Sequence, residues 1–592
     1  MAFFRWIGRI LIGALAGIGL LVIAAILLAS SAWRDFSNRI EPVPEQTLLT
    51  LDLGDGVSET NAGDPFALAG LTHNLTMADL VLGLEAAGKD PRVKGLALKL
   101  GSGDLPLARA EEIRDALKAF RAQGKFVLAF AESFGEAGDG NTHYLLATGA
   151  DEIWLQPSGD VGLTGLRLET PFFKDTLDMI GVSVQMDRRK EFKGAIDSLT
   201  ANSMPAPQRE NLQQLVDSMT ATLADGVGER IGGDAAAGRA LIDQGPFLAA
   251  DALKAKLVDR LAYRDEFEAE LDRRTSKAVR YSLADYAATL RPPEDAPQIA
   301  LVHGLGPIQL AADGSPFGDV VMDAKTVSEA LRDAREDSKV KAILFRIDSP
   351  GGSYVAADTI WREVARAREE GKPVVVSMGS VAASGGYFVA APAAAIVAEP
   401  STITGSIGVF GGKFVLSDLW AKLGVTFDGV QAGTNAGIDS ANEDYSYAGW
   451  QHLQTSLDSI YQDFVTKVGA GRKLDADAVE RVAKGQVWTG MDAAANGLVD
   501  KLGGLTTAVA EARRAIGLAP DAPVRLVNFP QEPHDLTSFL EQFAKAAEMR
   551  QFAVLARLGR MAASLERLVG SDSGVRAEMA PLLPASRLGS NP

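Results

Sequence analysis

The chain has 592 residues, 47% of them apolar, so it is too long for one ordinary domain and apolar enough to build several cores. Its formal net charge is −17, and no block rich in lysine and arginine stands out, which argues against a nucleic acid partner. Cysteine is absent, which excludes a disulfide framework and a thiol nucleophile. We therefore expect two large domains with an acidic, solvated surface.

The first predicted element is an uncharged apolar segment from Ile10 to Trp33, which is long enough to span a bilayer as a helix. Arg5 and Arg9 precede it without any acidic residue. This bias predicts residues 1–9 in the cytoplasm, a transmembrane anchor over 10–33 and the bulk of the chain outside. A cleaved signal peptide is the alternative, because Ala29–Ala32 offers small residues for cleavage. We favour the uncleaved anchor, because the apolar region of a signal peptide is usually only about 7–15 residues long.

Two similar strand-helix-strand patterns follow, 247 residues apart. Apolar strands that begin at Lys94 and Lys341 each end in a glycine-containing turn. Amphipathic stretches at 108–123 and 356–370 come next and are typical of helices, and a second apolar strand follows each of them. We expect β-α-β units on a largely parallel sheet in each half, and an internal duplication explains the repeat.

The repeat sets the domain organisation. It predicts an N-terminal half at 45–290 and a C-terminal half at 295–530. From Leu536 to Leu568, apolar and charged residues alternate at helical spacing. We therefore predict a helical tail at 531–592, in which this stretch covers the core or contacts a subunit, with a disordered end from Ala585 onward. An interfacial membrane helix is the alternative that we favour less.

The second half gathers serines and glycine-rich turns. Ser384 stands in Ala-Ala-Ser-Gly-Gly-Tyr, Ser406 stands in Thr-Gly-Ser-Ile-Gly, and Asp348–Gly352 reads Asp-Ser-Pro-Gly-Gly. A serine among small residues can present its hydroxyl on a tight strand-to-helix turn, and glycines let backbone N–H groups approach a substrate carbonyl. These features indicate acyl-transfer chemistry. A phosphate-binding turn is the alternative, but the stretch lacks the Gly-Lys-Ser/Thr ending of a P-loop.

A serine hydroxyl needs a neighbouring base. Of the five histidines, only His303 has glycine neighbours, and its segment is typical of an opening strand and turn. A lysine is then the leading alternative, provided that an apolar site lowers its pKa towards neutrality.

The duplication is asymmetric at these positions. Ser384 aligns with Asn141 and Ser406 with Leu163, so the N-terminal half lacks the nucleophile. The segment Arg188–Asp197 of that half carries lysines where the C-terminal half has none. This division suggests a site shared between the halves.

With these motifs the chain resembles the signal peptide peptidase A family, also called protease IV, in its long duplicated bacterial form. The resemblance runs from about residue 45 to about residue 530. It implies an α/β fold with tandem duplicated Clp-protease/crotonase-like domains after one N-terminal transmembrane helix. It also implies a serine peptidase with a Ser/Lys dyad.

The resemblance assigns roles to particular residues. Ser384 would be the nucleophile. Lys193 would be the base, since Phe-Lys-Gly-Ala matches the family's Tyr-Lys-Ser-Ala-type motif with Phe for Tyr and Gly for Ser. Ser406 would position the lysine amine, and the N–H groups of Gly352 and Gly385 would form the oxyanion hole.

The resemblance further implies a single-pass protein of the bacterial inner membrane, with its bulk on the periplasmic side. Its expected substrates are remnant signal peptides and similar apolar peptides, its expected assembly is a homotetramer, and neither a metal nor an organic cofactor is expected. Two other functions stay open: a crotonase-like acyl-CoA enzyme and a catalytically inactive membrane scaffold. The presence of Ser384, Ser406 and Lys193 together argues against the scaffold, and Lys190 is the fallback for the base.

Overall fold

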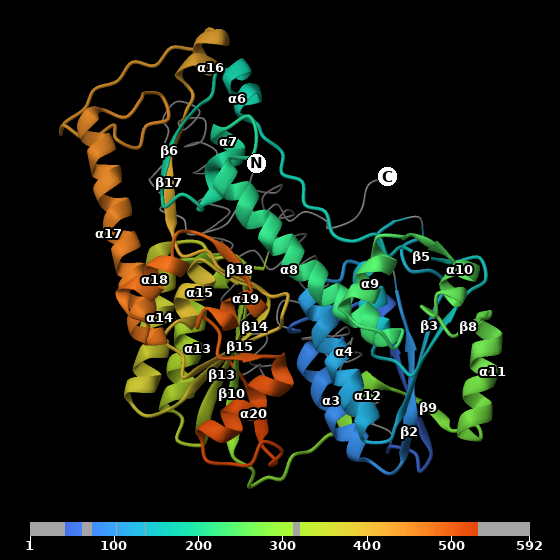
Figure 1. Cartoon of the computed structure of the whole chain (residues 1–592). Helices are drawn as coiled ribbons and strands as arrows, with labels where there is room; N and C mark the ends of the chain where they lie inside the picture. Colours follow the sequence, from blue (N-terminus) through green and yellow to red (C-terminus); the bar gives the residue numbers. More distant parts are fainter. Residues whose placement is uncertain (1–41, 62–73, 102, 137, 312–319, 531–592) are drawn as a thin grey trace, which may run out of the picture.

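Two largely parallel β-sheets, one in each half of the chain, form the framework of the protein (Figure 1). The computed structural model describes residues 42–61, 74–101, 103–136, 138–311 and 320–530. Within these ranges, no helix has both the length and the apolar character needed to cross a membrane. The predicted segments at 1–9, 10–33 and 531–592 lie outside the described residues.

The first sheet has six parallel strands in the order β8-β4-β3-β2-β1-β9. The strands are β1 (Thr47–Asp52), β2 (Val93–Lys99), β3 (Phe126–Ala131), β4 (Glu152–Leu155), β8 (Arg260–Leu261) and β9 (Val279–Ser282). One face packs on the main core of this half, which includes residues of α3 (Met77–Lys89), α4 (Leu107–Ala122), α5 (Asn141–Ala147) and α12 (Leu283–Thr289). The other face packs on α11 (Arg264–Thr275) through Phe267 and Leu271.

The second sheet repeats this plan and is parallel except for the pairing of β16 with β18. Its strands are β10 (Gln298–Leu305), β13 (Val340–Ser349), β14 (Val374–Ala383), β15 (Ala395–Ala398), β16 (Ile403–Gly405), β18 (Val487–Thr489), β19 (Lys501–Leu502) and β20 (Arg525–Phe529). One face is covered by α20 (Leu505–Ala515). The other packs against α13 (Ala324–Glu336), α14 (Tyr354–Glu369), α15 (Gly385–Ala390) and α17 (Tyr447–Arg472).

Local sequence explains why these helices form. In α13, the side chain of Asp323 accepts a hydrogen bond from the amide of Thr326 and so caps the first turn. Val327, Leu331 and Ala334 recur at helical spacing and are buried. The helices predicted at 108–123 and 356–370 are found as α4 and α14, with bounds that differ from the prediction by at most two residues.

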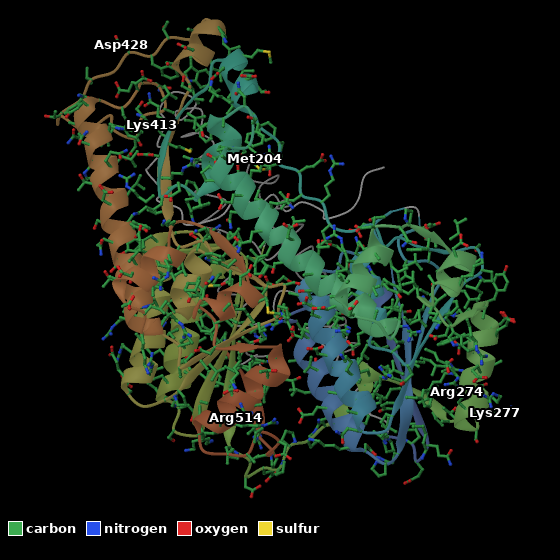
Figure 2. All side chains as sticks on the ribbon, in the orientation of Figure 1. Met204, Arg274, Lys277, Lys413, Asp428 and Arg514 are labelled. Carbon is green, nitrogen blue, oxygen red and sulfur yellow. The ribbon has the colours of Figure 1, made fainter. Side chains whose placement is uncertain are left out.

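A two-stranded antiparallel ribbon joins the halves beyond the sheets. It pairs β6 (Ser183–Arg189) with β17 (Val409–Val415). On the ribbon, the buried amine of Lys413 donates to the carbonyl oxygens of Ile438 (3.1 Å) and Ser440 (2.8 Å), which ties a long loop to β17 (Figure 2). From this end of the molecule, α8 (Ala206–Arg230) runs back to the first half (Figure 1).

The remaining elements are short. They are η1 (Leu53–Asp55), β5 (Asp160–Val161), α6 (Lys174–Ile180), η2 (Gly194–Ile196), α7 (Asp197–Thr200), α9 (Ala235–Ile242), β7 (Phe247–Leu248), α10 (Ala249–Lys254), β11 (Ile308–Gln309), β12 (Met322–Asp323), α16 (Ser417–Lys422), α18 (Ala476–Val482) and α19 (Gly490–Ala495).

Buried carboxyl groups lie where the two halves meet. Glu111 on α4 accepts hydrogen bonds from the amide (3.0 Å) and the hydroxyl (2.6 Å) of Ser401 in the other half. Burial raises the pKa of Glu111 to about 7, although the bonds from Ser401 oppose the shift. Burial and the nearby Glu112 and Glu111 carboxyls raise the pKa of Glu399 well above its usual value. This contact between the halves therefore holds protons that an unfolded chain would release.

We expect the stability of the protein to fall as the pH rises through this window. Between the usual pKa of 4.5 and the folded value of about 7, folded Glu111 binds more protons than unfolded Glu111. The free energy of unfolding should therefore decrease from pH 5 to pH 8, by up to about 3 kcal/mol from this group. Glu111→Gln should flatten that dependence in denaturant titrations, whereas Glu132→Gln on an exposed site should keep it. A Glu111→Gln protein with the full wild-type dependence would contradict this expectation.

Candidate active site

Ser384 lies at the junction between β14 and α15. Its backbone has φ 55° and ψ −115°, a conformation that side chains rarely adopt, and its amide donates to the carbonyl oxygen of Gly405 (2.8 Å). Gly386 permits this turn, because a Cβ there would lie 2.7 Å from the carbonyl oxygen of Ser349. The small residues around Ser384 thus allow the tight strand-to-helix turn that the sequence predicted.

Lys193 reaches the same point from the other half of the chain. Its Nζ lies 2.8 Å from Ser384 Oγ, 3.0 Å from Ser406 Oγ and 2.9 Å from the carbonyl oxygen of Ser406. The side chains of Lys193 and Ser384 are 1% and 0% exposed, respectively. The structure therefore brings together the three side chains that the sequence analysis singled out, across 191 residues between Lys193 and Ser384.

The surroundings favour a neutral amine. Burial lowers the pKa of Lys193 well below its usual value, because the charged ammonium loses its hydration there. A neutral amine keeps a lone pair that can accept a proton from the Ser384 hydroxyl. The geometry and the shift in pKa together allow proton transfer between these two groups.

The segment that carries Lys193 is fixed on both sides. The guanidinium of Arg188 donates to the carbonyl oxygen of Lys193 (3.2 Å) and pairs with Asp197. The amide of Phe192 donates to the carbonyl oxygen of Lys484 (3.1 Å) in the C-terminal half. These bonds hold the lysine backbone in place while its side chain crosses to the serine.

The segment before β18 was missed by the sequence analysis. Besides holding Phe192, it accepts a bond from the amide of Ser406 at the carbonyl oxygen of Gln486 (2.6 Å). A Cβ at Gly485 would lie 2.5 Å from the amide nitrogen of Lys193, so only glycine fits between the two backbones. The isolated pattern around Gly485 carries no local signal of this role, because the contact joins positions almost 300 residues apart.

Gly352 lies next to Gly385, the residue that follows Ser384. Gly352 forms a parallel bridge with Ile308, whose amide donates to Gly351 (2.8 Å) and whose carbonyl oxygen accepts from Ser353 (2.9 Å). In such a bridge the amide of Gly352 itself points away from Ile308. A Cβ built on Gly385 would lie 3.2 Å from the Gly352 nitrogen, so the two residues are neighbours.

The other candidates lie elsewhere. Lys190, the fallback base, is partly exposed and its Nζ lies 3.2 Å from a carboxylate oxygen of Glu480. His303 is near Glu59 and Arg346, and burial lowers its pKa to about 4. At the position equivalent to Ser384, Asn141 donates to the carbonyl oxygen of Gly165 (2.8 Å), so an amide occupies the place of the nucleophile.

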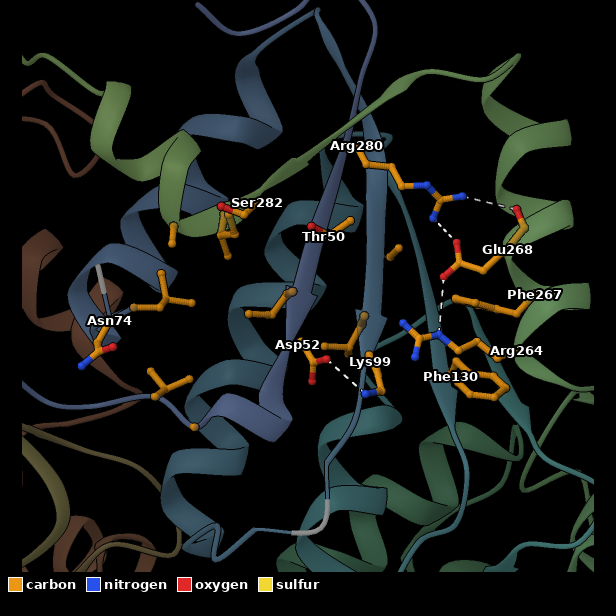
Figure 3. Close-up of a pocket in the computed structure, with 18 of the residues that line it drawn as sticks. Thr50, Asp52, Asn74, Lys99, Phe130, Arg264, Phe267, Glu268, Arg280 and Ser282 are labelled. Atoms are coloured by element: carbon orange, nitrogen blue, oxygen red, sulfur yellow. Dashed lines mark hydrogen bonds and ion pairs between the residues drawn. The ribbon is translucent and has the colours of Figure 1, made fainter. Parts of the chain in front are cut away.

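A separate cavity of about 1050 Å³ lies in the N-terminal half, between the sheet and α11 (Figure 3). There Lys99 Nζ lies 3.2 Å from a carboxylate oxygen of Asp52, and Arg280 pairs with Glu268. Because the lysine of this cavity is paired with a carboxylate and not with a hydroxyl, the cavity does not reproduce the arrangement around Ser384.

A buried amine beside a serine hydroxyl on a strained strand-to-helix turn is an arrangement of serine hydrolases that use lysine. Residues 119–278 and 366–519 match the family model of peptidase family S49. The first range contains Lys193, and the second contains Ser384 and Ser406.

Curated relatives agree with this match. The chain is 34% identical to Protease 4 of Salmonella typhi over 86% of this chain and 85% of that protein. It is 32% identical to the chloroplastic serine protease SPPA of Arabidopsis thaliana, over 79% and 69% of the two chains. It is also 32% identical to Protease 4 of Haemophilus influenzae, over 80% and 78%. The chain belongs to peptidase family S49, and it is a serine peptidase built from a duplicated domain.

Proposed function

We propose that Ser384 is the nucleophile of this peptidase and that Lys193 is its general base. The observation that carries the proposal is the buried amine of Lys193, 2.8 Å from Ser384 Oγ. We assign to the Ser406 hydroxyl, 3.0 Å from the same amine, the role of orienting it. The amides of Gly352 and Gly385 would donate to the oxyanion of the tetrahedral intermediate.

The reaction then proceeds in two stages, acylation of the serine and hydrolysis of the acyl-enzyme. Neutral Lys193 accepts the proton of Ser384 as the hydroxyl oxygen attacks the peptide carbonyl carbon. The protonated lysine gives that proton to the leaving amine when the C–N bond breaks, which leaves an acyl-enzyme. Water attacks the ester carbonyl, Lys193 accepts a proton from the water, and that proton returns to Ser384 as the acid product leaves.

Replacing Ser406 by alanine should slow turnover with little effect on substrate binding. The variant removes one of the groups around the amine but keeps the carbonyl oxygen of Ser406, 2.9 Å away. We expect kcat to fall by roughly 10–100-fold with KM nearly unchanged, since orientation of a base acts on the chemical step. Steady-state kinetics of Ser406→Ala and Ser406→Thr would test this, because threonine keeps the hydroxyl and should retain more activity. Equal losses in both variants would contradict it.

We propose that the substrates are cleaved signal peptides and similar apolar peptides, and that the apolar segment at 10–33 anchors the enzyme in the bacterial inner membrane with its bulk on the periplasmic side. The length of that segment and the arginines before it support the anchor. The family resemblance supports the substrate class and a homotetramer. An anchored peptidase would meet such peptides where they are released.

The experiment that tests the function compares two fluorogenic peptides of equal length, one with an apolar signal-peptide-like sequence and one rich in polar residues. Full-length protein in detergent should cleave the apolar peptide at a higher kcat/KM. Equal cleavage of both peptides would contradict the proposed preference for apolar substrates but would be consistent with peptidase activity. Turnover of an acyl-CoA thioester without cleavage of either peptide would favour the crotonase-like alternative.

A further inference from the structure

Strand β14 is irregular just before Ser384. Along its pairing with β13, Ile347 lies opposite Met378, whereas Ser349 lies opposite Ala382. Two steps along β13 therefore correspond to four steps along β14, and the extra residues bulge out of the ladder. A bulge of this kind changes the direction of the strand that follows it, and here that strand leads directly to Ser384.

The side chain of Asp348 fills this irregularity. Its Oδ1 accepts a hydrogen bond from the amide of Val381 (3.1 Å), and its Oδ2 accepts one from the amide of Ser380 (3.4 Å). A Cβ at Gly379 would lie 2.9 Å from Asp348 Oδ2, so glycine leaves the space that the carboxylate occupies. The carboxylate thus takes the place of the ladder partners that the bulged amides have lost.

The N-terminal half holds the same carboxylate from the other side. Arg109 Nη2 on α4 lies 3.6 Å from Asp348 Oδ2 and 3.1 Å from Glu59 Oε1. Glu59 in turn pairs with the buried Arg346 of β13, at 3.0 Å from Nε. A chain of charges therefore runs from one half to the bulge of the other, in surroundings where such contacts are little screened.

The duplicated half provides a comparison. The position that corresponds to Asp348 by the offset of 247 residues is Gly101, which has no side chain. There the pairing of β2 with β3 ends at Lys99 opposite Phe130, the pair that corresponds to Arg346 opposite Ser377, and so it stops before the position of the irregularity in the other half. The carboxylate therefore belongs to the half that bears the serine and has no counterpart at Gly101 of the other half.

We propose that Asp348 is a positioning residue of the active site and that Arg109 supports it from the other half. The carboxylate stabilises the bulge in β14. The bulge in turn directs the end of the strand so that Ser384 lies against Lys193, with the amides of Gly352 and Gly385 beside the serine. This inference rests on the proposed role of Ser384. According to this proposal, the N-terminal half has two roles in the active site: it supplies Lys193, and its Arg109 helps to align Ser384.

The test measures turnover per active site in Asp348→Asn, Asp348→Ala and Arg109→Met. Active sites are counted by covalent titration with a fluorophosphonate, and folding is checked by thermal melting. Asp348→Ala should lower kcat on the order of 100-fold, because a displacement of about 1 Å has effects of that size. Asp348→Asn, which keeps one acceptor oxygen, should lose less, and Arg109→Met should lose about 10-fold. KM should change little in all three.

The matched control is Arg114→Met, also on α4, whose guanidinium pairs with Glu229 within the N-terminal half. It should turn over at the wild-type rate. Full titration with slow turnover per site in the Asp348 and Arg109 variants would support the proposal. If these variants instead have fewer titratable active sites, each with the wild-type turnover rate, the residues have a purely structural role and the proposal is overturned. If Asp348→Ala fails to fold, Asp348→Asn and Arg109→Met decide by the same criterion. A wild type that is neither labelled nor active would overturn the proposed function itself.

Discussion

Replacing Ser384 by alanine is expected to abolish peptide hydrolysis without unfolding the protein. Loss of a serine nucleophile that acts together with its base lowers kcat by roughly 10⁴–10⁶-fold. The hydroxyl is buried and adjoins the amine of Lys193, and the short turn around it depends on glycines that the variant keeps. Steady-state hydrolysis of the apolar peptide, at equal concentrations of folded protein, measures the effect.

The control for this variant is Ser276→Ala. Ser276 also has a positive φ, 51°, but it is exposed at the end of α11, far along the chain from the site. The two variants therefore share an alanine at a positive φ and differ in the loss of the hydroxyl beside Lys193. If the Ser384→Ala protein still hydrolyses the peptide, the nucleophile must be another residue.

Replacing Lys193 should lower activity to an extent comparable with Ser384→Ala, and the methionine variant should in addition stabilise the protein near neutral pH. Lys193→Met removes the base, and Lys193→Arg introduces a guanidinium that stays protonated, so both should lower kcat on the order of 10⁴-fold. Lys190→Met is the matched control, because that lysine pairs with Glu480 instead of a serine. An inactive Lys190→Met beside an active Lys193→Met would reverse the assignment.

The pH dependence of the wild type follows from the same burial. Lys193 must be neutral to act as a base, and its pKa lies well below the usual 10.5. The value of kcat/KM should therefore rise with pH through a midpoint well below that of an ordinary lysine. A midpoint near 10.5 would contradict a desolvated base.

The pH dependence of stability tests the lowered pKa of Lys193 independently of activity. Between the lowered pKa and 10.5, the unfolded chain binds a proton that folded Lys193 does not, so the contribution of Lys193 to stability increases with pH in that window, opposite to the contribution of Glu111. Lys193→Met removes this penalty. Its melting temperature should exceed that of the wild type near neutral pH, and the two should converge above pH 10.5.

Local sequence patterns predicted the helices, strands and turns whose formation depends on residues close together in the chain. Alternation, amphipathic spacing and glycine turns identified the β-α-β units, and small residues around Ser384 indicated a strand-to-helix turn. The asymmetry of the duplication indicated that the base lies in the half without the serine. The resemblance selected Lys193 over Lys190, and the structure places only Lys193 against the serine hydroxyl.

Other parts depend on contacts that no local pattern encodes. The backbone of Lys484–Gln486 holds both Phe192 and Ser406, and Arg109 meets Asp348 across the two halves. The extra residues in β14 also look like ordinary strand residues in the sequence, because the irregularity exists only relative to β13. The anchor at 10–33 and the tail at 531–592 stay predictions.

The proposed site is assembled from segments that the ribosome makes at very different times. Lys193 emerges early, Ser384 and Ser406 follow much later, and the carbonyl oxygens of Lys484 and Gln486 that fix the site come nearly 300 residues after the lysine. A nascent chain therefore has no complete serine–lysine pair until most of its second half has been made and has folded onto the first. The order of these segments therefore places completion of the serine–lysine pair and its supporting contacts late in synthesis, after residue 486.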